Sequence, residues 1–333
     1  MKPVPYPLLI LVLAVLLGAL FFLSMITGPK AAGTFELLNM MNTGQADTAW
    51  MIMGQVRLPR TLLAALIGMS LGLAGATLQG FLRNPLADPS IVGVSPAASL
   101  GAVIAFYTGL SGLFPLALPL MGIGGALLCV LLLLGLAGRG GVLTLILAGV
   151  AISSLAAAFM SLALNLSPNP YAAADIMFWL MGSVTDRSMD HVYLATPFMV
   201  AGWIMLAASG RSLDALSLGE EAAAGLGVNL NRTRLLVVGG TAVSVGAATA
   251  VSGGIGFIGL VVPHLLRPLV GHTPSKLLLA SALGGGVLLL AADILVRLIV
   301  MVNGELKLGV LTSLLGAPFF LWLILKARTE LES

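Results

Sequence analysis

The longest stretch without a charged residue runs from Pro89 to Gly138, and other charge-free runs recur along the chain. Soluble domains carry about 25% charged residues. Here 9% of the 333 residues are charged and 59% are hydrophobic. A charge in the middle of a bilayer costs about 2.5–3.5 kcal/mol, so a chain with many membrane spans must be charge-poor. The sequence predicts an all-α polytopic membrane protein, because helices satisfy their own backbone hydrogen bonds in lipid.

Charge-free runs of about 20 residues, the length needed to cross a bilayer, define the predicted spans. Residues 3–29 carry no charge and no cleavage site follows at once, so we expect the first span to be a retained helix rather than a signal peptide. The segment 256–270 is apolar but short, which leaves the total at nine or ten, and we adopt about ten transmembrane helices. The other predicted spans are 7–27, 61–81, 92–108, 114–137, 142–166, 192–209, 234–253, 277–297 and 308–326.

The basic residues test this topology. With ten spans and both termini in the cytoplasm, the cytoplasmic side holds more Lys and Arg than the outer side, as the positive-inside rule requires. The cytoplasmic set is Lys2, Arg83, Arg139, Arg211, Arg232, Arg234, Arg267, Lys276, Lys326 and Arg328. The outer set is Lys30, Arg57, Arg60, Arg187, Arg297 and Lys307. The outer arginines therefore need a reason of their own.

Two segments of the predicted single transmembrane domain, residues 1–333, are not spans. Residues 28–60 form an outer loop, which we interpret as an interfacial helix anchored by Trp50. Residues 211–233, "RSLDALSLGEEAAAGLGVNLNRT", predict one or two short cytoplasmic surface helices, because helix-forming alanines lie between glycines.

Short stretches in the two halves of the chain show weak sequence similarity to each other. "RTLLAALIG" from Arg60 resembles "RTRLLVVGG" from Arg232, and "IVGVSP" ending at Pro96 resembles "FIGLVVP" ending at Pro263. In the ten-span topology the first pair opens spans two and seven, which run in opposite directions. This similarity thus indicates either an inverted repeat, as in many transporters, or a chance resemblance.

The sequence lacks the residues that several kinds of functional site require. No G-x-x-x-x-G-K-[ST] motif occurs, and His191, His264 and His272 are scattered, so we expect neither a nucleotide site nor a metal site. Ion-coupled carriers usually need several ionisable groups in the membrane, and the one good candidate is Asp293, which Arg297 one turn on could simply neutralise. A permease driven by a separate ATPase therefore fits better than an ion-coupled secondary carrier or a channel.

The stretch "FLRNPLADPSIVGVS", residues 81–95, concentrates polar residues between two apolar runs. Pro85 and Pro89 end the preceding helix and stiffen the turn, since proline fixes φ and lacks an N–H donor. Arg83 and Asp88 keep the turn at the water boundary. Such a rigid turn suits a gate that presents a few side chains, although a simple helix-ending loop has the same composition.

Four stretches resemble the FecCD-type permeases, the membrane subunits of ABC importers for iron–siderophore complexes, haem and vitamin B12. They are "RLPRTLLAALIGMSLGLAGATLQGFLRNPLADPSIVGVS", "SLGEEAAAGLGV", "GFIGLVVPHLLRPLVG" and "ELKLGVLTSLLGAPFFLWLI". The resemblance runs from about residue 50 to 326. Two departures from the family's pattern are "GVSPAASLGA" and Lys307, where the family usually has proline.

The resemblance implies a vitamin B12-importer-like fold in the bacterial inner membrane. It also implies a second copy of the chain, two cytoplasmic ATPase subunits and a periplasmic substrate-binding protein as partners, with no nucleic acid. The chain itself would be no enzyme and would hold no cofactor, because ATP and Mg²⁺ belong to the ATPase. We expect an iron–siderophore or haem cargo, as the family's commonest, with cobalamin as the alternative.

The resemblance also assigns residues to roles. Contact with the ATPase falls to Leu218, Gly219, Glu220, Glu221, Ala224, Leu226 and Gly227, for which an ordinary amphipathic surface helix is the alternative. Docking of the binding protein falls to Arg57, Arg60 and Arg297; alternatively Arg297 only pairs with Asp293, while Arg57 and Arg60 bind lipid phosphate. The cytoplasmic gate falls to Asn84, Leu86 and Thr144.

Overall fold

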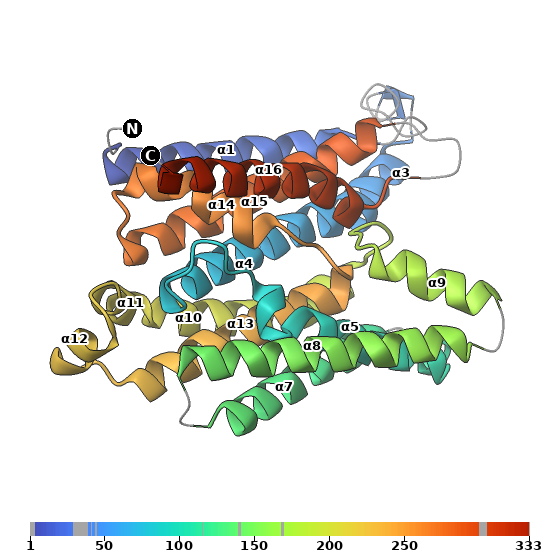
Figure 1. Cartoon of the computed structure of the whole chain (residues 1–333). Coiled ribbons are helices and arrows are strands. Elements are labelled where there is room, and N and C mark those ends of the chain that lie inside the picture. Colours follow the sequence, from blue (N-terminus) through green and yellow to red (C-terminus); the bar gives the residue numbers. More distant parts are fainter. Residues whose placement is uncertain are drawn as a thin grey trace.

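The computed structural model describes residues 4–28, 39–40, 42–43, 45–114, 116–138, 141–167, 170–299 and 305–332. These residues are folded into helices joined by short turns, and no β-strand occurs among them (Figure 1). The elements are α1 (Tyr6–Ile26), α3 (Ala46–Met51), η2 (Ile52–Arg57), α4 (Leu58–Phe81), η3 (Pro89–Val92), α5 (Val94–Tyr107), α6 (Leu110–Leu113), α7 (Ala117–Ala137), α8 (Val142–Asn165), α9 (Pro170–Leu180), α10 (Met189–Ala208), α11 (Gly210–Leu216), α12 (Glu220–Gly225), α13 (Leu230–Ser252), α14 (Ile258–Leu266), η4 (Arg267–Val270), α15 (Pro274–Leu298) and α16 (Leu308–Glu332).

The predicted spans correspond to helices. In the described part of the chain seven helices are long and apolar enough to cross a membrane, namely α1, the continuous helix Ala46–Phe81, α7, α8, α10, α13 and α15. Shorter apolar helices occupy the remaining predicted spans, at α5, α14 and α16. The segment 256–270 forms α14 and η4, which together stay well short of the roughly 20 residues that a bilayer requires.

Local capping explains why some helices begin earlier than hydropathy predicted. The Asn229 side chain accepts a hydrogen bond from the Arg232 N–H, so α13 starts at Leu230 rather than near residue 234. Ser188 caps α10, which starts at Met189 rather than at 192. Within the predicted outer loop 28–60, the chain is already helical from Ala46 and continues through the π-helical turn η2 into α4.

The two ends of the helix bundle differ in what they carry. At one end the backbone N–H of Val4 donates a hydrogen bond to Leu269 O, and the Lys276 ammonium lies over the ring of Tyr6. Figure 1 shows α11, α12 and the end of α16 at this same end, and α3 and α9 toward the opposite one. Helices α4 and α13 run in opposite directions (Figure 1), as an inverted repeat would require, and the alternative of chance similarity stays open.

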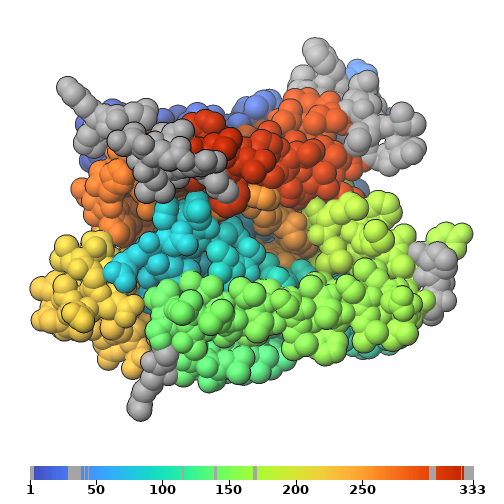
Figure 2. Space-filling model, in the orientation of Figure 1, coloured from blue at the N-terminus to red at the C-terminus, as the bar shows by residue number. Residues whose placement is uncertain are grey.

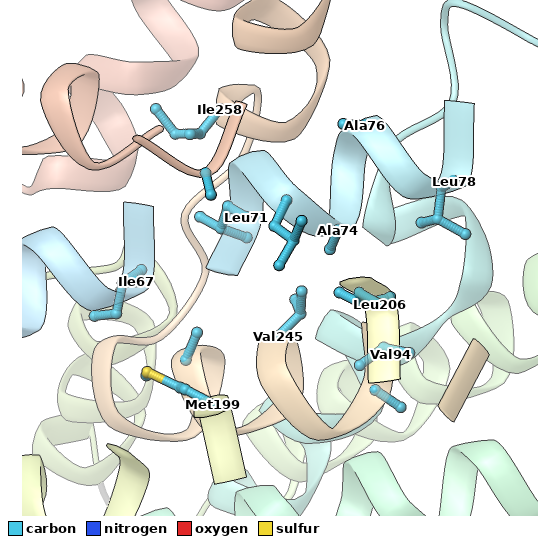
Figure 3. Packing of buried hydrophobic residues seen from close by; sticks show 14 of the residues in the cluster. Ile67, Leu71, Ala74, Ala76, Leu78, Val94, Met199, Leu206, Val245 and Ile258 are labelled. Atoms are coloured by element: carbon cyan, nitrogen blue, oxygen red, sulfur yellow. The ribbon is translucent and has the colours of Figure 1, made fainter. Parts of the chain in front are cut away.

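Close backbone contacts hold the centre of the bundle. A Cβ added at Gly68 would lie 2.3 Å from the carbonyl oxygen of Gly285, and one at Gly72 would lie 2.0 Å from that of Ser281. Helices α4 and α15 are therefore antiparallel and touch through their backbones, as small residues permit in lipid. Leu71 of α4, Leu206 of α10 and Val245 of α13 belong to the cluster of buried apolar side chains that packs the bundle (Figure 3).

The outer helices show the opposite pattern. Helices α4 and α13 are mostly buried, whereas α1, α7 and α8 expose most of their surface. Their exposed positions carry large apolar side chains, such as Phe22, Leu131 and Leu143. A soluble monomer rarely exposes apolar patches of this size, so these faces are suited to lipid or to another protein.

Candidate functional site

The α11–α12 segment, residues 210–227, projects from the end of the bundle that carries the termini (Figure 1). Leu213 and Leu216 are fully buried and anchor α11, while the Asp214 carboxylate accepts a 2.8 Å hydrogen bond from Ser275 N at the start of α15. Gly219 and Gly227 flank α12 with φ of +110° and +82°, which L side chains rarely adopt. The segment for which the sequence predicted one or two short surface helices contains two, α11 and α12.

The surface of α12 fits contact with another protein. Leu218 and Leu226 are largely exposed, Glu221 and Ala224 are exposed, and Glu220 is half-buried. Exposed leucines beside paired carboxylates leave an apolar patch with a charged rim, which is the usual composition of a docking surface. The structure places the seven predicted contact residues together on this segment; their role in docking stays a prediction.

The polar turn, residues 82–88, lies beside this segment. Arg83 has a φ of +50°, and its Nη1 atom lies 3.9 Å from the position of a Cβ built on Gly219. The Asn84 side chain accepts from Leu86 N at 2.9 Å, and the Asp88 side chain accepts from Ser90 N at 2.9 Å. These two local bonds make the turn rigid, as the sequence predicted from its prolines.

A serine-lined cavity of 790 Å³ adjoins the polar turn. It lies between α8 and α16, and Figure 2 shows the hollow between these two helices. Its polar groups include Asp88 and the hydroxyls of Ser90, Ser95, Ser99, Ser153 and Ser154. Burial raises the pKa of the Asp88 carboxyl, and its bonds to Ser90 oppose that rise. The cavity is therefore weakly polar with a single acidic group at its wall.

The three predicted gate residues differ in position. Leu86 lines the serine-lined cavity, and Asn84 is exposed two residues before it. Thr144 is exposed near the start of α8. The contacts of α8 with η3 lie further along the helix, at Gly149, where an added Cβ would lie 2.3 Å from the Ile91 carbonyl oxygen, and at Ser153, whose hydroxyl donates to Ser90 O. The gate assignment stays a prediction, and Thr144 has the weaker geometric support.

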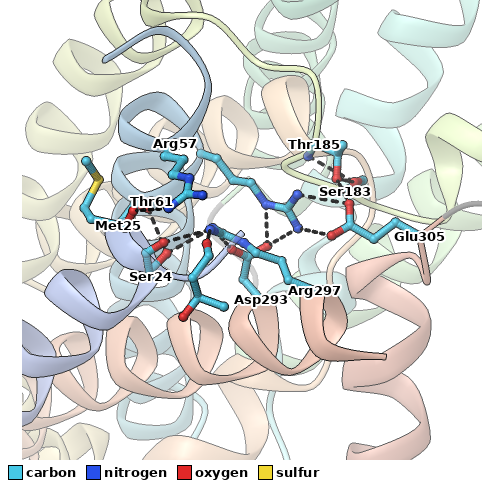
Figure 4. Close-up of polar contacts among 11 residues, drawn as sticks. Ser24, Met25, Arg57, Thr61, Ser183, Thr185, Asp293, Arg297 and Glu305 are labelled. Atoms are coloured by element: carbon cyan, nitrogen blue, oxygen red, sulfur yellow. Dashed lines mark hydrogen bonds and ion pairs between the residues drawn. The ribbon is translucent and has the colours of Figure 1, made fainter. Parts of the chain in front are cut away.

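Toward the other end of the bundle, a polar cluster joins Arg57, Arg60, Asp293, Arg297 and Glu305 (Figure 4). Arg60 binds Asp293 Oδ1 through Nε and Nη2, at 2.9 and 2.8 Å, and also binds both carboxylate oxygens of Glu305. Arg297 pairs with Asp293 Oδ2 one helical turn away, which is the pairing that the sequence offered as the alternative to docking. Asp293 is fully buried between two guanidinium groups.

Backbone carbonyls at the end of α1 accept hydrogen bonds from Arg57 and Arg297. Arg57 Nη1 donates to Met25 O and Ile26 O at 2.9 and 2.8 Å, and Arg297 Nη1 donates to Ser24 O at 2.8 Å. These carbonyls belong to the last turn of a helix, where no intrahelical donor remains. Arg57 and Arg297 thus cap α1, and both are at least nine-tenths buried.

The sequence did not identify Glu305. Its carboxylate lies 120 residues from Thr185, whose hydroxyl donates to Glu305 Oε2 at 2.9 Å, and 245 residues from Arg60. Together these side chains line a pocket of 420 Å³, to which Arg57, Arg187 and Arg297 also contribute. Four predicted outer basic residues therefore meet at one place, and the docking role of Arg57, Arg60 and Arg297 stays a prediction.

The described residues include no group of three or more His, Cys, Asp or Glu side chains that could hold a metal ion. Asp293, the one candidate for ion coupling, has both carboxylate oxygens bonded to arginines. Both oxygens of this carboxylate are thus engaged by fixed positive charges, which weakens the case for it as a group that alternately takes up and releases an ion.

Comparisons with known proteins agree with this geometry. The chain matches the FecCD transport family over residues 14–326. It is 38% identical to the hemin transport system permease protein HmuU of Yersinia pestis, over 96% of this chain and 97% of that protein. It is 43% identical to the vitamin B12 import system permease protein BtuC of Vibrio cholerae, over 82% of each chain.

A solved structure gives the same fold. It is described as an inward-facing conformation of a metal-chelate type ABC transporter, and it superposes with a TM-score of 0.84 at 31% identity, covering 96% of this chain and 99% of that one. The helical fold is therefore that of an ABC transporter permease, and the chain belongs to the FecCD transport family.

Proposed function

We propose that the chain is the permease subunit of a binding-protein-dependent ABC importer that moves an iron chelate, either an iron–siderophore complex or haem, across the bacterial inner membrane. Two copies would surround the pathway, with both termini and the α11–α12 segment in the cytoplasm. The similarity to the hemin permease along nearly the whole of both chains supports this cargo class. Cobalamin is the second candidate, supported by the similarity to vitamin B12 permeases.

One observation carries the proposal: Gly219 of the α11–α12 segment lies beside Arg83 of the polar turn, and the polar turn borders the serine-lined cavity. A short helix seated in a partner's groove transmits movement as a rigid body. An ATPase dimer that closes on α12 would therefore move Arg83 and the turn behind it, and so change access to the cavity. ATP and Mg²⁺ would be bound by that ATPase, while this chain contributes no hydrolytic group.

The cavity walls also suit passage of a bulky ligand. They are predominantly apolar, with scattered hydroxyls and the carboxylate of Asp88. A ligand that meets few strong partners is not trapped on its way, so specificity would rest with the binding protein. The hollow between α8 and α16 is open on one side in the isolated chain, and a second copy would close it.

Reconstitution tests the proposal. The chain is co-expressed with a P-loop ATPase and a periplasmic binding protein encoded beside it, and the purified complex is placed in liposomes. We expect ATP hydrolysis that the loaded binding protein stimulates, and import that stops without ATP. Uptake driven by an ion gradient in vesicles with this chain alone would overturn the proposal.

The cargo is tested on the binding protein, where specificity is expected to lie. Haemin, a ferric hydroxamate and cyanocobalamin are titrated against it in parallel. Preference for either iron compound would support the primary assignment, and preference for cyanocobalamin would replace it with the alternative while leaving the importer function intact.

A further inference from the structure

Gln79 is a buried amide at the point where α4, the polar turn and α14 meet. It is 1% exposed, and it lies one helical turn beyond Gly75, whose added Cβ would lie 1.9 Å from the carbonyl oxygen of Gly259. Residues four apart share a helix face, so the same backbone contact that joins α4 to α14 directs Gln79 toward α14. The family comparison assigned this residue no role.

The amide nitrogen of Gln79 faces three backbone carbonyls. Its Nε2 atom lies 3.4 Å from Ala87 O, 3.3 Å from Gly259 O and 3.4 Å from Leu260 O. Its Oε1 atom accepts a 2.5 Å hydrogen bond from Arg267 Nη2. Of the two orientations of the Gln79 side-chain amide, only this one pairs each donor with an acceptor, because a guanidinium donates hydrogen bonds and carbonyls accept them.

Pro263 explains why α14 needs such a donor. The carbonyl of Gly259 would ordinarily accept from the N–H of the residue four positions on, which is Pro263 and has no N–H. Gly259 is itself buried, so a carbonyl without a partner would cost free energy there. Gln79 supplies the missing donor from another helix.

The same residue holds both halves of the polar turn. The backbone oxygen of Gln79 accepts from Asn84 N at 3.2 Å, and its side chain reaches Ala87 O. The far end of the turn also touches α14, since a Cβ at Gly259 would lie 2.9 Å from Pro89 Cδ and 3.4 Å from Asp88 Oδ2. The turn is thus bound to α14 by one side chain and one close contact.

We propose that Gln79 is a positioning residue that makes the polar turn and the first turn of α14 move as one body, so that displacement of the α11–α12 segment opens or closes the serine-lined cavity. Arg267 fixes the amide from the other side. This inference rests on the proposed function for its consequence, but the positioning itself concerns the chain alone and is tested separately.

Hydrogen–deuterium exchange of the full chain in lipid nanodiscs tests the positioning. Gln79→Leu removes the donor and the acceptor, and Gln79→Glu keeps the volume and the acceptor but removes the amide donor. We expect exchange in 84–91 and 257–262 to accelerate roughly two- to tenfold, as the loss of one net hydrogen bond implies. Thr77→Val is the matched control, because the buried Thr77 hydroxyl donates only to Leu73 O of its own helix.

Each outcome decides the positioning. Unchanged exchange in both segments would overturn it, and so would acceleration spread evenly over α4, α13 and α15, which would indicate general loosening. Acceleration confined to the two segments, and absent in Thr77→Val, would support it. If Gln79→Leu does not fold, Gln79→Glu and Arg267→Met remain, and Arg267→Met should produce the same local pattern more weakly.

A second readout tests the consequence. In the complex with the ATPase and the binding protein, Gln79→Glu should lower the ratio of stimulated to basal ATP hydrolysis, while Thr77→Val should retain it. A retained ratio in Gln79→Glu would overturn the link to gating. A wild-type complex without any stimulation would instead overturn the proposed function, and the exchange result would stand on its own.

Discussion

Arg60 and Glu305 form a two-pronged ion pair, with Nη1–Oε2 and Nη2–Oε1 separations of 3.0 and 2.6 Å. The pair ties the start of α4 to the segment that leads into α16, and Arg60 simultaneously binds Asp293 of α15. A bidentate guanidinium–carboxylate pair fixes orientation as well as distance. A single arginine of α4 therefore fixes the positions of α15 and of the segment that leads into α16.

Replacing Arg60 should destabilise the protein more than replacing Glu305. Arg60→Met leaves the fully buried Asp293 with one cationic partner, and we expect a loss of about 3 kcal/mol, the lower range for breaking a buried ion pair. The Glu305 side chain is 24% exposed, so Glu305→Gln should cost about 1 kcal/mol or less. Thermal unfolding in detergent measures both, with the exposed Arg211→Met as control, and equal losses in the two variants would contradict the expectation.

Stability should also depend on pH through Glu305. Burial opposes ionisation of the Glu305 carboxyl, but the hydrogen bonds and charge of Arg60, with the Thr185 hydroxyl, outweigh it and lower the pKa below its ordinary 4.5. A carboxyl whose pKa is lower in the folded state contributes stability above its unfolded pKa, and that contribution is lost as the pH falls through the folded value.

The measurement is unfolding temperature between pH 7 and pH 3. Wild type should lose stability below about pH 4.5, and Glu305→Gln should lose less over the same interval, because glutamine does not titrate. Identical pH profiles for the two proteins would show that Glu305 is not the group that carries this dependence.

The spans could be predicted from sequence because charge-free runs reflect the cost of charge in lipid, which acts on each segment independently. The polar cluster could be predicted only in part. Arg297 and Asp293 are one turn apart on one helix, so their ion pair can be inferred from sequence spacing. The ion pair of Arg60 with Glu305 depends instead on how helices far apart in the sequence pack. Helix α9 was missed because it is short and contains Asp175.

Gln79 shows what a closer inspection of the sequence could have found. A glutamine inside an otherwise apolar helix needs partners, and Pro263 inside a second helix leaves a carbonyl that needs a donor. Each signal is visible in the sequence by itself. Their connection is not, because it depends on the Gly75–Gly259 contact that brings the two helices together.

Charge reversal on α12 should uncouple the importer. Glu220→Arg with Glu221→Arg replaces an acidic surface that a basic or polar ATPase groove would accept, so we expect loss of stimulated ATP hydrolysis and loss of copurifying ATPase. Both side chains lie at the start of α12, and neither fills the core, so folding should be preserved. The double change to Gln is the control and should weaken coupling less. Unimpaired coupling in the Arg double variant would exclude the α12 surface as the contact with the ATPase.

Binding-protein docking should depend on salt through the arginine-lined pocket. Arg57, Arg60, Arg187 and Arg297 face Asp186 and Glu305 there, which leaves an excess of positive charge. We expect Arg187→Gln to weaken binding of the periplasmic protein roughly tenfold at low salt and less at high salt, because salt screens the attraction between the partly exposed Arg187 and a charged partner. Surface plasmon resonance on nanodiscs measures this, and an affinity independent of salt in the wild type would contradict charge-based docking.

The Gly75–Gly259 contact should tolerate no side chain. A Cβ at Gly75 would lie 1.9 Å from the Gly259 carbonyl oxygen and 2.5 Å from its Cα, and both atoms belong to backbone that cannot rotate away. Gly75→Val should therefore force α4 and α14 apart, at a cost above the roughly 1–3 kcal/mol typical of overpacked cores. Gly124→Val on α7 is the matched control, since nothing lies within 4 Å of its added Cβ. Yield of folded protein by size-exclusion chromatography compares the two, and recovery of Gly75→Val at the level of Gly124→Val would show that the two helices do not meet as closely as their backbones indicate.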